Sequence, residues 1–480
     1  MITFHILDSV SCYVEGLNWP QKEYIIEKTK LPVASAHMTA AFKTGNWDGK
    51  ESLFNEDGHT FIYMLDAICE ALEEIGVDLD SIKIEDYREN VVTIPENIHV
   101  PIDIVKAETG FDLREHQVNA VTIALRRLCG VIEAATSAGK TAITLAISKL
   151  LDPYIKTLIL VPSTILANQT YAYYEKSGLN TIKLGDFKPE KRAKALADNQ
   201  HIICTYKMLQ TSRDLFKDGV YAILGDETHV FGELTAEIYR DELRNCPVRL
   251  GLTGSMPPDK QKTQMIYAHL GGGQLIKVSV KEMTDKNIIA KATIHVIKTL
   301  HPEVADLSED SMWDWDTEFN YYITNTARLE AIANYINSLP RMNTLILCQP
   351  QAGEILKQYF NDRMIRDETK IADREAWLGE FDICTEPYYQ CASFGTAGTG
   401  ISVNQIQRVV LIDIGKPETL ILQSIGRGVR LDGKTNEVDV LDISSITKYA
   451  ERHEKIRIKL YKREHIAYNV VSEKIHVRGD

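Results

Sequence analysis

The sequence lacks any uninterrupted apolar run approaching the roughly 20 residues that a membrane-spanning helix needs. Its N-terminus, MITFHILDSVSCYVEG, lacks the basic start and the small-residue cleavage site of a signal peptide. The eight cysteines are scattered, and no two of them form a Cys-x-x-Cys pair. These absences argue against a disulfide framework, a zinc site and a membrane partner, and they predict a cytoplasmic protein with reduced thiols.

Positive net charge is also missing, because the 480 residues carry a formal charge of −13. Residues 1–100 hold 7 Lys/Arg and 18 Asp/Glu, a net charge of −11, whereas the other 380 residues hold 47 and 49, a net charge of −2. A local basic groove could still bind nucleic acid, but the bulk charge offers no support for such binding. The 44% apolar and 25% charged residues are typical of a soluble globular protein, and the length predicts about three domains.

Three regions divide the chain. Residues 1–103 hold short mixed segments and one helical pattern over 61–76, so we expect a small α+β accessory domain there. Beyond it, short apolar runs that are each followed by a helical pattern recur over residues 104–290 and again over 291–480. This rhythm predicts parallel sheets built from β-α-β units. The first runs lie at 130–135, 157–162, 201–205, 221–227 and 249–254, and the second at 344–349, 390–395 and 408–415.

A basic segment lies near the end of the chain. Residues 448–465 contain 7 Lys/Arg against 3 Glu and predict a partly amphipathic helix. Its charges are explained either by a solvated helix face or by contact with nucleic acid, and the sequence leaves both open.

The stretch EAATSAGKTA (133–142) joins a strand pattern to a helical one and ends in Gly139-Lys140-Thr141. At such a join, backbone N–H groups can hold phosphate oxygens, Lys140 can reach the β- and γ-phosphates, and Thr141 can offer a hydroxyl to Mg²⁺. The alternative is a small-residue turn, since one glycine stands where phosphate loops usually have two or more. Because Ser137 replaces a usual glycine, we expect a negative φ at that position.

A second candidate element is the run YAILGDETH (221–229), which ends a predicted strand in Asp226-Glu227. A carboxylate at the carboxyl edge of a sheet, beside a phosphate loop, can hold Mg²⁺, and its neighbour can polarise an attacking water. The alternative is a pair of solvent-facing acids at a strand end.

A third element, QSIGRGVR (423–430), places Arg427 and Arg430 three residues apart, which puts both side chains on one face of a helix. Guanidinium groups suit phosphate contact and the stabilisation of a transferring phosphoryl group. If the two sheet domains face each other, these arginines could reach ATP held by the first domain.

In this order the segments resemble the motifs of superfamily-two helicases, over roughly residues 111–430. The matching segments are FDLREHQ (111–117, adenine recognition), AATSAGKT (134–141, motif I), LILVPSTILANQ (158–169, motif Ia), ICTYKML (203–209, a nucleic-acid-contacting segment), DETH (226–229, motif II), LTGS (252–255, motif III), SFGTAGTGISV (393–403, motif V) and QSIGRGVR (motif VI). A narrower resemblance, to UvsW-type branch-migration helicases of phages, includes FKTGNWDGK (42–50) and the acidic helical segment that follows it.

The resemblance implies two RecA-like parallel-sheet domains in tandem, an α/β fold, with ATP and Mg²⁺ as ligands. It assigns adenine contact to Gln117 and phosphate binding to Thr136, Ser137, Ala138, Gly139, Lys140 and Thr141. It assigns metal binding to Thr141 and Asp226, the role of catalytic base to Glu227, and the role of arginine finger to Arg430, with Arg427 beside it. Ligand sensing is assigned to Gly400, and coupling between ATP and nucleic acid to His229, Thr253, Ser255 and Gln423. Two positions depart from the pattern: Thr228 replaces Ala or Cys in motif II, and Ser402 replaces an acidic residue in motif V, so no ribose-contacting carboxylate is carried over.

Nucleic-acid contact is implied at Pro162, Ser163, Thr205 and Thr396, although each alone also fits an ordinary strand-end loop. In the N-terminal region, Trp47 between Lys43 and Lys50 could stack on a base while the lysines hold phosphates. Alternatively, Trp47 anchors a hairpin turn in a small core.

Three functions are open at this point. The first is an ATP-driven DNA helicase that acts as a monomer on forked or branched, single- and double-stranded DNA, in the host cytoplasm if a phage encodes it. The second is a related motor, either an RNA helicase or a restriction-type translocase, although no nuclease motif is evident. The third is an ATP-dependent switch that does not translocate, which would leave the arginines of the second domain unexplained.

Overall fold

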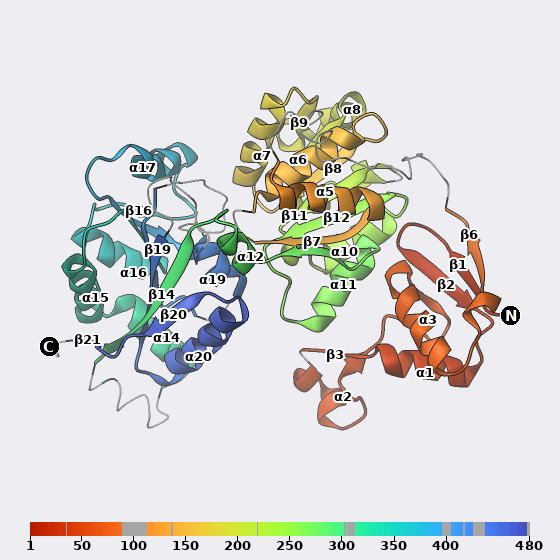
Figure 1. Cartoon of the computed structure of the whole chain (residues 1–480), viewed down its shortest axis with the longest axis horizontal. Helices are drawn as coiled ribbons and strands as arrows, with labels where there is room; N and C mark the ends of the chain where they lie inside the picture. The colour runs from red at the N-terminus through yellow and green to blue at the C-terminus, as the bar shows by residue number, and fades with distance from the viewer. Residues whose placement is uncertain are drawn as a thin grey trace. The chain divides into compact units, whose positions relative to one another are not determined.

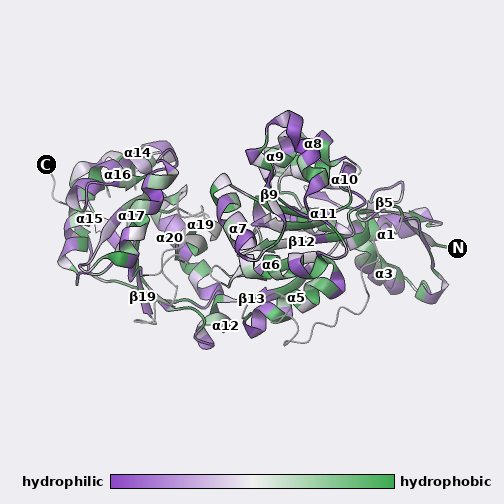
Figure 2. Ribbon diagram, turned by 90° about the horizontal axis from the view of Figure 1, so that it is seen from above, coloured by the Kyte–Doolittle hydropathy of each residue, from purple (hydrophilic) through white to green (hydrophobic). Residues whose placement is uncertain are grey.

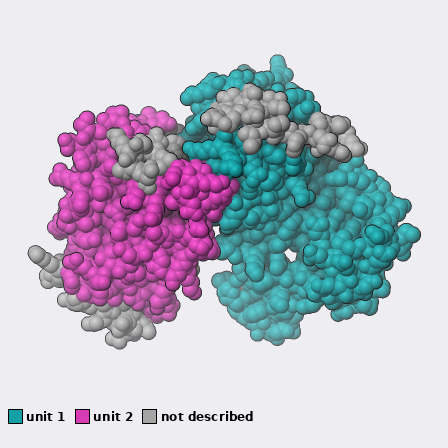
Figure 3. Space-filling model, viewed as in Figure 1, with its two compact units in different colours: residues 1–134, 139–277 teal, residues 135–138, 278–480 magenta. Residues whose placement is uncertain are grey.

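The computed structural model describes residues 1–34, 36–88, 113–135, 138–217, 219–301, 304, 313–395, 405–415, 418–425 and 437–477. The chain divides into two compact units, one formed by residues 1–134 and 139–277 and the other by residues 135–138 and 278–480 (Figure 3). The first unit holds a small mixed sheet and a larger parallel sheet, and the second unit holds another parallel sheet.

The small sheet lies at the N-terminus (Figure 1), and its strand order is β5-β2-β1-β6. Its strands are β1 (Thr3–Ile6), β2 (Ser11–Glu15), β5 (His59–Phe61) and β6 (Lys83–Asp86), and the helices beside it are α1 (Trp19–Thr29) and α3 (Leu65–Glu74). A separate two-stranded pair, β3 (Leu31–Pro32) and β4 (Lys50–Glu51), flanks the short helix α2 (Ala40–Lys43).

Alternation along these strands builds a core on one face of the small sheet. Phe4, Ile6, Cys12 and Val14 are buried against apolar residues of α1 and α3, including Ile68. Successive side chains of a strand point to opposite faces, so the residues between these four lie on the other face. The predicted helix over 61–76 begins later than expected, because its first residue belongs to β5 and a 3-10 turn precedes α3.

The larger sheet of the first unit has the strand order β13-β7-β12-β11-β8-β10-β9, and its paired strands run parallel. The strands are β7 (Cys129–Ala134), β8 (Thr157–Val161), β9 (Thr181–Lys183), β10 (His201–Thr205), β11 (Ala222–Asp226), β12 (Val248–Thr253) and β13 (Gln274–Val278). The helices are α5 (Glu115–Arg127), α6 (Lys140–Leu151), α7 (Thr164–Lys176), α8 (Pro189–Asp198), α9 (Tyr206–Thr211), α10 (Glu233–Asp241) and α11 (Lys260–Leu270).

Both faces of this parallel sheet are covered by helices. Leu158 and Ile202 pack in a cluster with apolar residues of α9, α10 and α11, whereas their neighbours Ile159 and Ile203 pack in another cluster with α6 and α7. Burial on both sides explains why the strands are nearly continuous apolar runs in the sequence. Figure 2 shows these hydrophobic strands between helices that carry both hydrophobic and hydrophilic residues.

The N-terminal sheet contacts the parallel sheet of its own unit through α11. The rings of Phe61 and His269 lie 5.0 Å apart, and those of Tyr63 and Tyr267 lie 5.5 Å apart. In addition, the backbone N–H of Ser9 donates to the carbonyl of Arg244 at 3.0 Å, and Gln261 Nε2 donates to Glu51 Oε2 at 2.9 Å. Aromatic pairs at this separation add to the stabilisation from buried area.

The second unit has the strand order β16-β17-β15-β18-β19-β14-β20, with β21 also paired to β14, and these neighbouring strands run parallel. The strands are β14 (Lys291–Leu300), β15 (Thr344–Cys348), β16 (Met364–Ile365), β17 (Tyr389–Ser393), β18 (Arg408–Ile412), β19 (Glu437–Ser445), β20 (Ala467–Val470) and β21 (Ile475–His476). The helices are α12 (Val280–Asp285), α14 (Trp315–Thr324), α15 (Thr326–Ser338), α16 (Pro350–Leu356), α17 (Ile371–Ile383), α19 (Glu418–Ile425) and α20 (Lys448–Arg463).

The expected fold class is confirmed: two α/β parallel-sheet domains follow a small mixed N-terminal sheet domain. The basic C-terminal segment is the helix α20, and its buried face includes Arg457 and Tyr461, which both bond to Asp442 on β19. The other basic residues of α20 stay partly or fully exposed, so nucleic-acid contact there stays a prediction. No helix among the described residues is long and apolar enough to cross a membrane.

Candidate nucleotide site

The phosphate-loop candidate lies between the end of β7 and the start of α6. Gly139 caps the helix with φ +82° and ψ +42°, a left-handed conformation that L side chains rarely adopt. A Cβ at this position would lie only 2.2 Å from Nε2 of Gln117, so the side chain of Gln117 packs directly over the loop. Strain and close packing together require glycine here. The first N–H groups of α6 have no partner within the helix and suit an anion.

Gln117, the predicted adenine contact, lies on α5 and is buried. Its Oε1 accepts a hydrogen bond of 2.8 Å from the backbone N–H of Arg114, which fixes the amide plane. The amide nitrogen is thereby directed toward Gly139, at the loop. The structure therefore brings Gln117 to the nucleotide site, and its contact with adenine stays a prediction.

The acidic pair lies at the carboxyl end of β11. Glu227 has φ +50° and ψ +49°, a left-handed conformation that is uncommon for a residue other than glycine and concentrates at functional sites. Its backbone N–H donates to Asp226 Oδ1 at 3.0 Å. The Tyr206 hydroxyl donates to the Asp226 carbonyl at 3.0 Å, and the Thr228 hydroxyl donates to the Leu252 carbonyl at 3.0 Å. These bonds hold the strained turn in place.

A chain of polar contacts joins the helix start to this turn and continues to β12. Lys140 Nζ lies 3.2 Å from Glu227 Oε1, and His229 Nδ1 lies 3.3 Å from Glu227 Oε2. His229 Nδ1 also lies 3.0 Å from Thr253 Oγ1, and that hydroxyl donates to the Ser255 carbonyl at 2.9 Å. Since Thr253 uses its single proton on Ser255, His229 Nδ1 must carry the proton in their shared bond. Glu227 Oε2 is buried and makes no hydrogen bond to any described residue.

The two carboxyls of the pair have opposite pKa shifts. Burial raises the pKa of Asp226 to about 6, and the neighbouring charge of Glu227 acts in the same direction. Burial also acts to raise the pKa of Glu227, but Lys140 and His229 outweigh it and lower the pKa to about 2. Glu227 is therefore ionised at neutral pH, while Asp226 is a carboxyl that a nearby cation would stabilise in its charged form.

These residues fit a magnesium ion in their chemistry. Carboxylate and hydroxyl oxygens are the ligands that Mg²⁺ prefers, and it commonly takes only one or two of them from protein, with waters and substrate phosphates for the rest. Asp226 supplies the carboxylate, and Thr141 lies in the first turn of α6. Among the described residues, no group of three or more His, Cys, Asp or Glu side chains could hold a metal ion by itself.

Two of the predicted nucleic-acid contacts lie at the same edge of the sheet. Ser163 follows β8 and caps α7 by accepting from the Leu166 N–H at 3.3 Å, and Thr205 ends β10 and caps α9 by accepting from the Met208 N–H at 3.1 Å. β8 and β10 are neighbours, so both caps and Pro162 lie side by side. Capping explains both residue types structurally, and contact with nucleic acid stays a prediction.

The N-terminal candidates have a local structural role. The indole Nε1 of Trp47 donates to the Lys50 carbonyl at 2.9 Å across the turn, which favours the interpretation of Trp47 as a turn anchor. Lys43 ends α2, and both lysine side chains are exposed. Base stacking by Trp47 stays a prediction.

Several predicted residues lie outside the described part of the chain: Thr136, Ser137, Thr396, Gly400, Arg427 and Arg430, together with the side chain of Gln423. The expected negative φ of Ser137 is among them. Ala138 is described and fully buried.

Two residues that hold the site were not predicted from the sequence as parts of it. Tyr206 orients the end of β11 through its hydroxyl, and burial raises the pKa of that hydroxyl well above its ordinary value. Glu133, near the end of β7, is buried and pairs with Lys277 at 2.9 Å. Both lie in segments that the sequence analysis singled out, Tyr206 in ICTYKML and Glu133 in EAATSAGKTA, but neither residue was given a role there.

The chain is similar to several known proteins. Residues 110–257 match the family described as "Type III restriction enzyme, res subunit". The chain is 22% identical over 440 residues to "ATP-dependent DNA helicase uvsW" of Enterobacteria phage T4, which covers 84% of this chain and 82% of that protein. It is 29% identical over 212 residues to "DNA 3'-5' translocase XPB2" of Sulfurisphaera tokodaii, covering 42% of this chain and 44% of that protein.

A solved structure, "ATP-dependent Type ISP restriction-modification enzyme LlaBIII bound to DNA", covers 86% of this chain and 34% of that chain at 14% identity, with a TM-score of 0.57. At that identity the likeness shows a shared fold. The similarity to the two helicase-type relatives and the family match show that the chain resembles a superfamily-two helicase, and among those the UvsW protein.

Proposed function

We propose that this chain is an ATP-dependent DNA helicase or translocase. The observation that carries the proposal is the chain of contacts from Lys140 through Glu227 and His229 to Thr253. It links the phosphate loop, the acidic pair and the end of the neighbouring strand β12. The names of the two curated relatives, a DNA helicase and a DNA translocase, support the same activity.

In the proposed reaction, a water oxygen bonds to the γ-phosphorus of ATP, and the bond from that phosphorus to the bridging oxygen of ADP breaks. Glu227 accepts the proton of the water, since its buried Oε2 has no other hydrogen bond among the described residues. In the structure, Nζ of Lys140 lies 3.2 Å from Oε1 of Glu227 and neutralises the charge of that carboxylate. Moving Lys140 onto a phosphate would remove that charge, so the carboxylate would become a stronger base when ATP binds.

Mg²⁺, when bound through Asp226 and Thr141, would neutralise charge on the phosphate oxygens. Gln117 and the N–H groups from Gly139 onward position the nucleotide. Thr136, Ser137 and Ala138 complete the loop in this proposal. Arg427 and Arg430 would stabilise the charge that develops on the γ-phosphate.

Coupling to DNA is assigned to the far end of the polar chain. His229 shares its Nδ1 proton with Thr253, whose hydroxyl donates to the Ser255 carbonyl. A change in the position of Glu227 therefore displaces groups at the end of β12. Gly400 and Gln423 are proposed partners in this coupling, and Pro162, Ser163, Thr205 and Thr396 would contact the DNA backbone.

The finer role follows the resemblance to the UvsW protein. We infer unwinding or branch migration of forks, junctions or displacement loops in phage-type replication, recombination and repair, in the host cytoplasm and as a monomer. We keep the division into an N-terminal domain (1–103), an ATP-binding domain (104–290) and a C-terminal helicase domain (291–480). Lys43, Trp47 and Lys50 would supply a small basic patch for DNA in the first of these.

A restriction-type translocase is the second candidate. It is favoured by the match of residues 110–257 to a restriction-enzyme subunit family. Such a motor would also hydrolyse ATP on DNA, but it would translocate along intact duplex and separate no strands. An RNA helicase would be stimulated by RNA, and a non-translocating switch by neither nucleic acid.

The test is ATP hydrolysis by the full chain without nucleic acid and with forked DNA, a Holliday junction, a displacement loop, linear duplex or RNA, followed by strand-separation assays. We expect stimulation by branched DNA and separation of its strands. Absence of stimulation by any DNA would overturn the proposal. Linear duplex that stimulates hydrolysis without strand separation would favour the translocase.

Two variants sharpen the test. Lys140→Ala should abolish hydrolysis and retain DNA binding, whereas Lys176→Ala, on an exposed lysine at the end of α7, should change neither. Thr253→Val removes the hydroxyl between His229 and Ser255, so we expect it to lower DNA stimulation more than basal hydrolysis. Equal loss of both rates would count against a coupling role for Thr253.

A further inference from the structure

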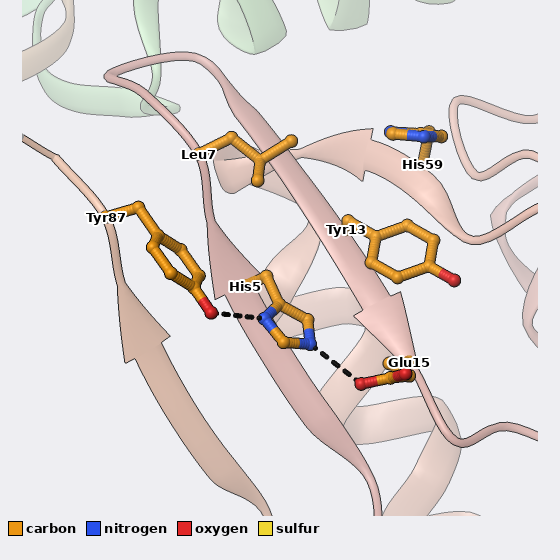
Figure 4. A pocket seen from close by; sticks show the side chains of 6 residues that line it. All are labelled: His5, Leu7, Tyr13, Glu15, His59 and Tyr87. Carbon is orange, nitrogen blue, oxygen red and sulfur yellow. Dashed lines mark hydrogen bonds and ion pairs between the residues drawn. The ribbon is translucent and has the colours of Figure 1, made fainter.

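The open face of the N-terminal sheet carries a row of aromatic rings, one from each of its four adjacent chain segments (Figure 4). Register places His59 of β5 opposite Tyr13 of β2, and Tyr13 opposite His5 of β1. Tyr87 follows β6, and its backbone N–H donates to the Ile6 carbonyl at 2.9 Å, which continues the pairing. Neighbouring rings lie 5.0, 5.8 and 5.8 Å apart along this aromatic row.

The aromatic row lies on the face opposite the helix-covered core, and the rings line a hollow of about 440 Å³. Tyr87 is 57% exposed, and Leu7 at one end of the hollow is 40% exposed. Single exposed apolar residues are ordinary, but a contiguous set of them on one sheet face marks an interaction surface.

One carboxylate, that of Glu15, lines the same hollow, and a second, that of Glu85, contacts His5. Glu15 Oε2 lies 3.1 Å from His5 Nε2, and Glu85 Oε2 lies 3.3 Å from His5 Nδ1. The hydrogen bonds from Lys83 and Tyr87 lower the pKa of Glu85 to about 2, so it is ionised at neutral pH. Glu15 is 63% exposed, and its carboxylate reaches into the hollow beside the rings.

The charge around the aromatic row selects the class of ligand. Residues 1–100 carry a net charge of −11, and Lys83, which borders the row, is ion-paired with Glu85. Platforms that stack nucleic-acid bases combine aromatic rings with a positively charged groove for the phosphates. Here the rings are combined with carboxylates, which repel phosphate and attract a cation.

We propose that the aromatic row binds a basic segment of a partner protein, with an arginine side chain lying over Tyr13 and Tyr87 and its charge beside Glu15. A guanidinium group is planar, stacks on aromatic faces and forms bidentate bonds with carboxylates, so arginine fits this surface better than lysine. The surface is separate from the nucleotide site, so the proposal does not depend on the proposed ATP hydrolysis.

The test is a fluorescence-anisotropy titration of the full chain with a fluorescein-labelled peptide of four Arg-Gly repeats, at low salt. Control peptides have Lys or Gln in place of each Arg, and a labelled oligo-dT probe is titrated in parallel. We expect the arginine peptide to bind most tightly and the glutamine peptide to show no binding. Each of Tyr13→Leu and Tyr87→Leu should weaken the arginine peptide about two- to fivefold, the range expected for one exposed cation–π contact.

Matched variants separate the aromatic row from the general acidity of the domain. Glu15→Gln should weaken the arginine peptide, whereas Glu23→Gln, on the exposed part of α1, should leave its affinity unchanged. Circular dichroism of each variant verifies that it is folded. If one leucine variant misfolds, the other leucine variant and the comparison of Glu15→Gln with Glu23→Gln carry the test. Affinity that is equal for all folded variants would overturn the proposal. The proposal would also be overturned if oligo-dT bound the wild type and the tyrosine variants lost that binding, since the aromatic row would then stack bases.

Discussion

Replacing Arg328 with methionine should destabilise the second unit strongly. Arg328 lies on α15 and is fully buried, and its guanidinium donates to both carboxylate oxygens of Asp413 at 2.8 Å. Its Nε also donates to the hydroxyls of Thr299 on β14 and Ser445 on β19, at 3.1 and 2.9 Å. One side chain thus joins a helix, two central strands and the residue that follows β18.

The expected magnitude follows from what Arg328→Met leaves behind. The side chain of Asp413 is only 7% exposed, so its carboxylate would be left buried without its partner. Removing one partner of such a buried pair costs about 3–5 kcal/mol in the free energy of unfolding. Arg328→Lys keeps the charge but loses the planar fork, so we expect a smaller loss of roughly 1–3 kcal/mol from the groups it leaves unsatisfied.

The measurement is urea unfolding of the full chain, with hydrogen exchange of peptides from α15 and β18 to locate the loss within the second unit. Arg341→Met is the matched control, because Arg341 is exposed at the start of the loop before β15. Burial raises the pKa of Asp413 and Arg328 opposes that shift, so the carboxyl in Arg328→Met should take up a proton more readily. The difference in the free energy of unfolding between the wild type and Arg328→Met should therefore shrink as the pH falls below 7. A variant as stable as the control at pH 7 would refute this reasoning.

Two further predictions concern the first unit. Gly139→Ala adds a Cβ 2.2 Å from Gln117 Nε2 and should weaken ATP binding about tenfold or more by fluorescent-nucleotide titration, while Gly178→Ala, also at positive φ but in open space, should not. Burial, aided by Arg249, lowers the pKa of His269 to about 4, so the unfolded state binds protons more readily and stability should fall as the pH drops from about 6.5 to about 4. His269→Gln should remove roughly 3 kcal/mol of this pH dependence in denaturation measured at each pH, and an unchanged dependence would contradict it.

The sequence was sufficient to predict the strands that are buried on both faces. Every predicted apolar run of the two α/β domains is a strand, and no end differs from the predicted one by more than three residues. The long central strands β14 and β19 carry no continuous apolar run and were not predicted. In β19 the interrupting acids are Asp439 and Asp442, which are compensated by Arg408 on β18 and Arg457 on α20. Pairing across elements cannot be read from local periodicity.

In the candidate site, too, some features could be predicted from local sequence and others could not. The positions of Lys140 and the acidic pair could be predicted, because a helix start and strand ends meet at one edge of a parallel sheet. The hydrogen bond from His229 to Thr253 could not, since it depends on β11 and β12 being neighbours and on the left-handed turn at Glu227. The aromatic row was even less predictable from local sequence. Its four rings are spread over more than 80 residues of sequence and meet only because of the strand order β5-β2-β1-β6.

The glycine shortage of the candidate phosphate loop has a physical explanation at the positions that the structure describes. Gly139 has a backbone conformation that excludes most L residues, and the space for a Cβ is filled by Gln117. Ala138 is fully buried, so that position requires a small side chain rather than an unusual φ. One position thus needs conformational freedom and its neighbour needs only small volume. A loop with a single glycine can therefore still present the N–H groups of α6 to phosphate, provided that Gln117 stays in place.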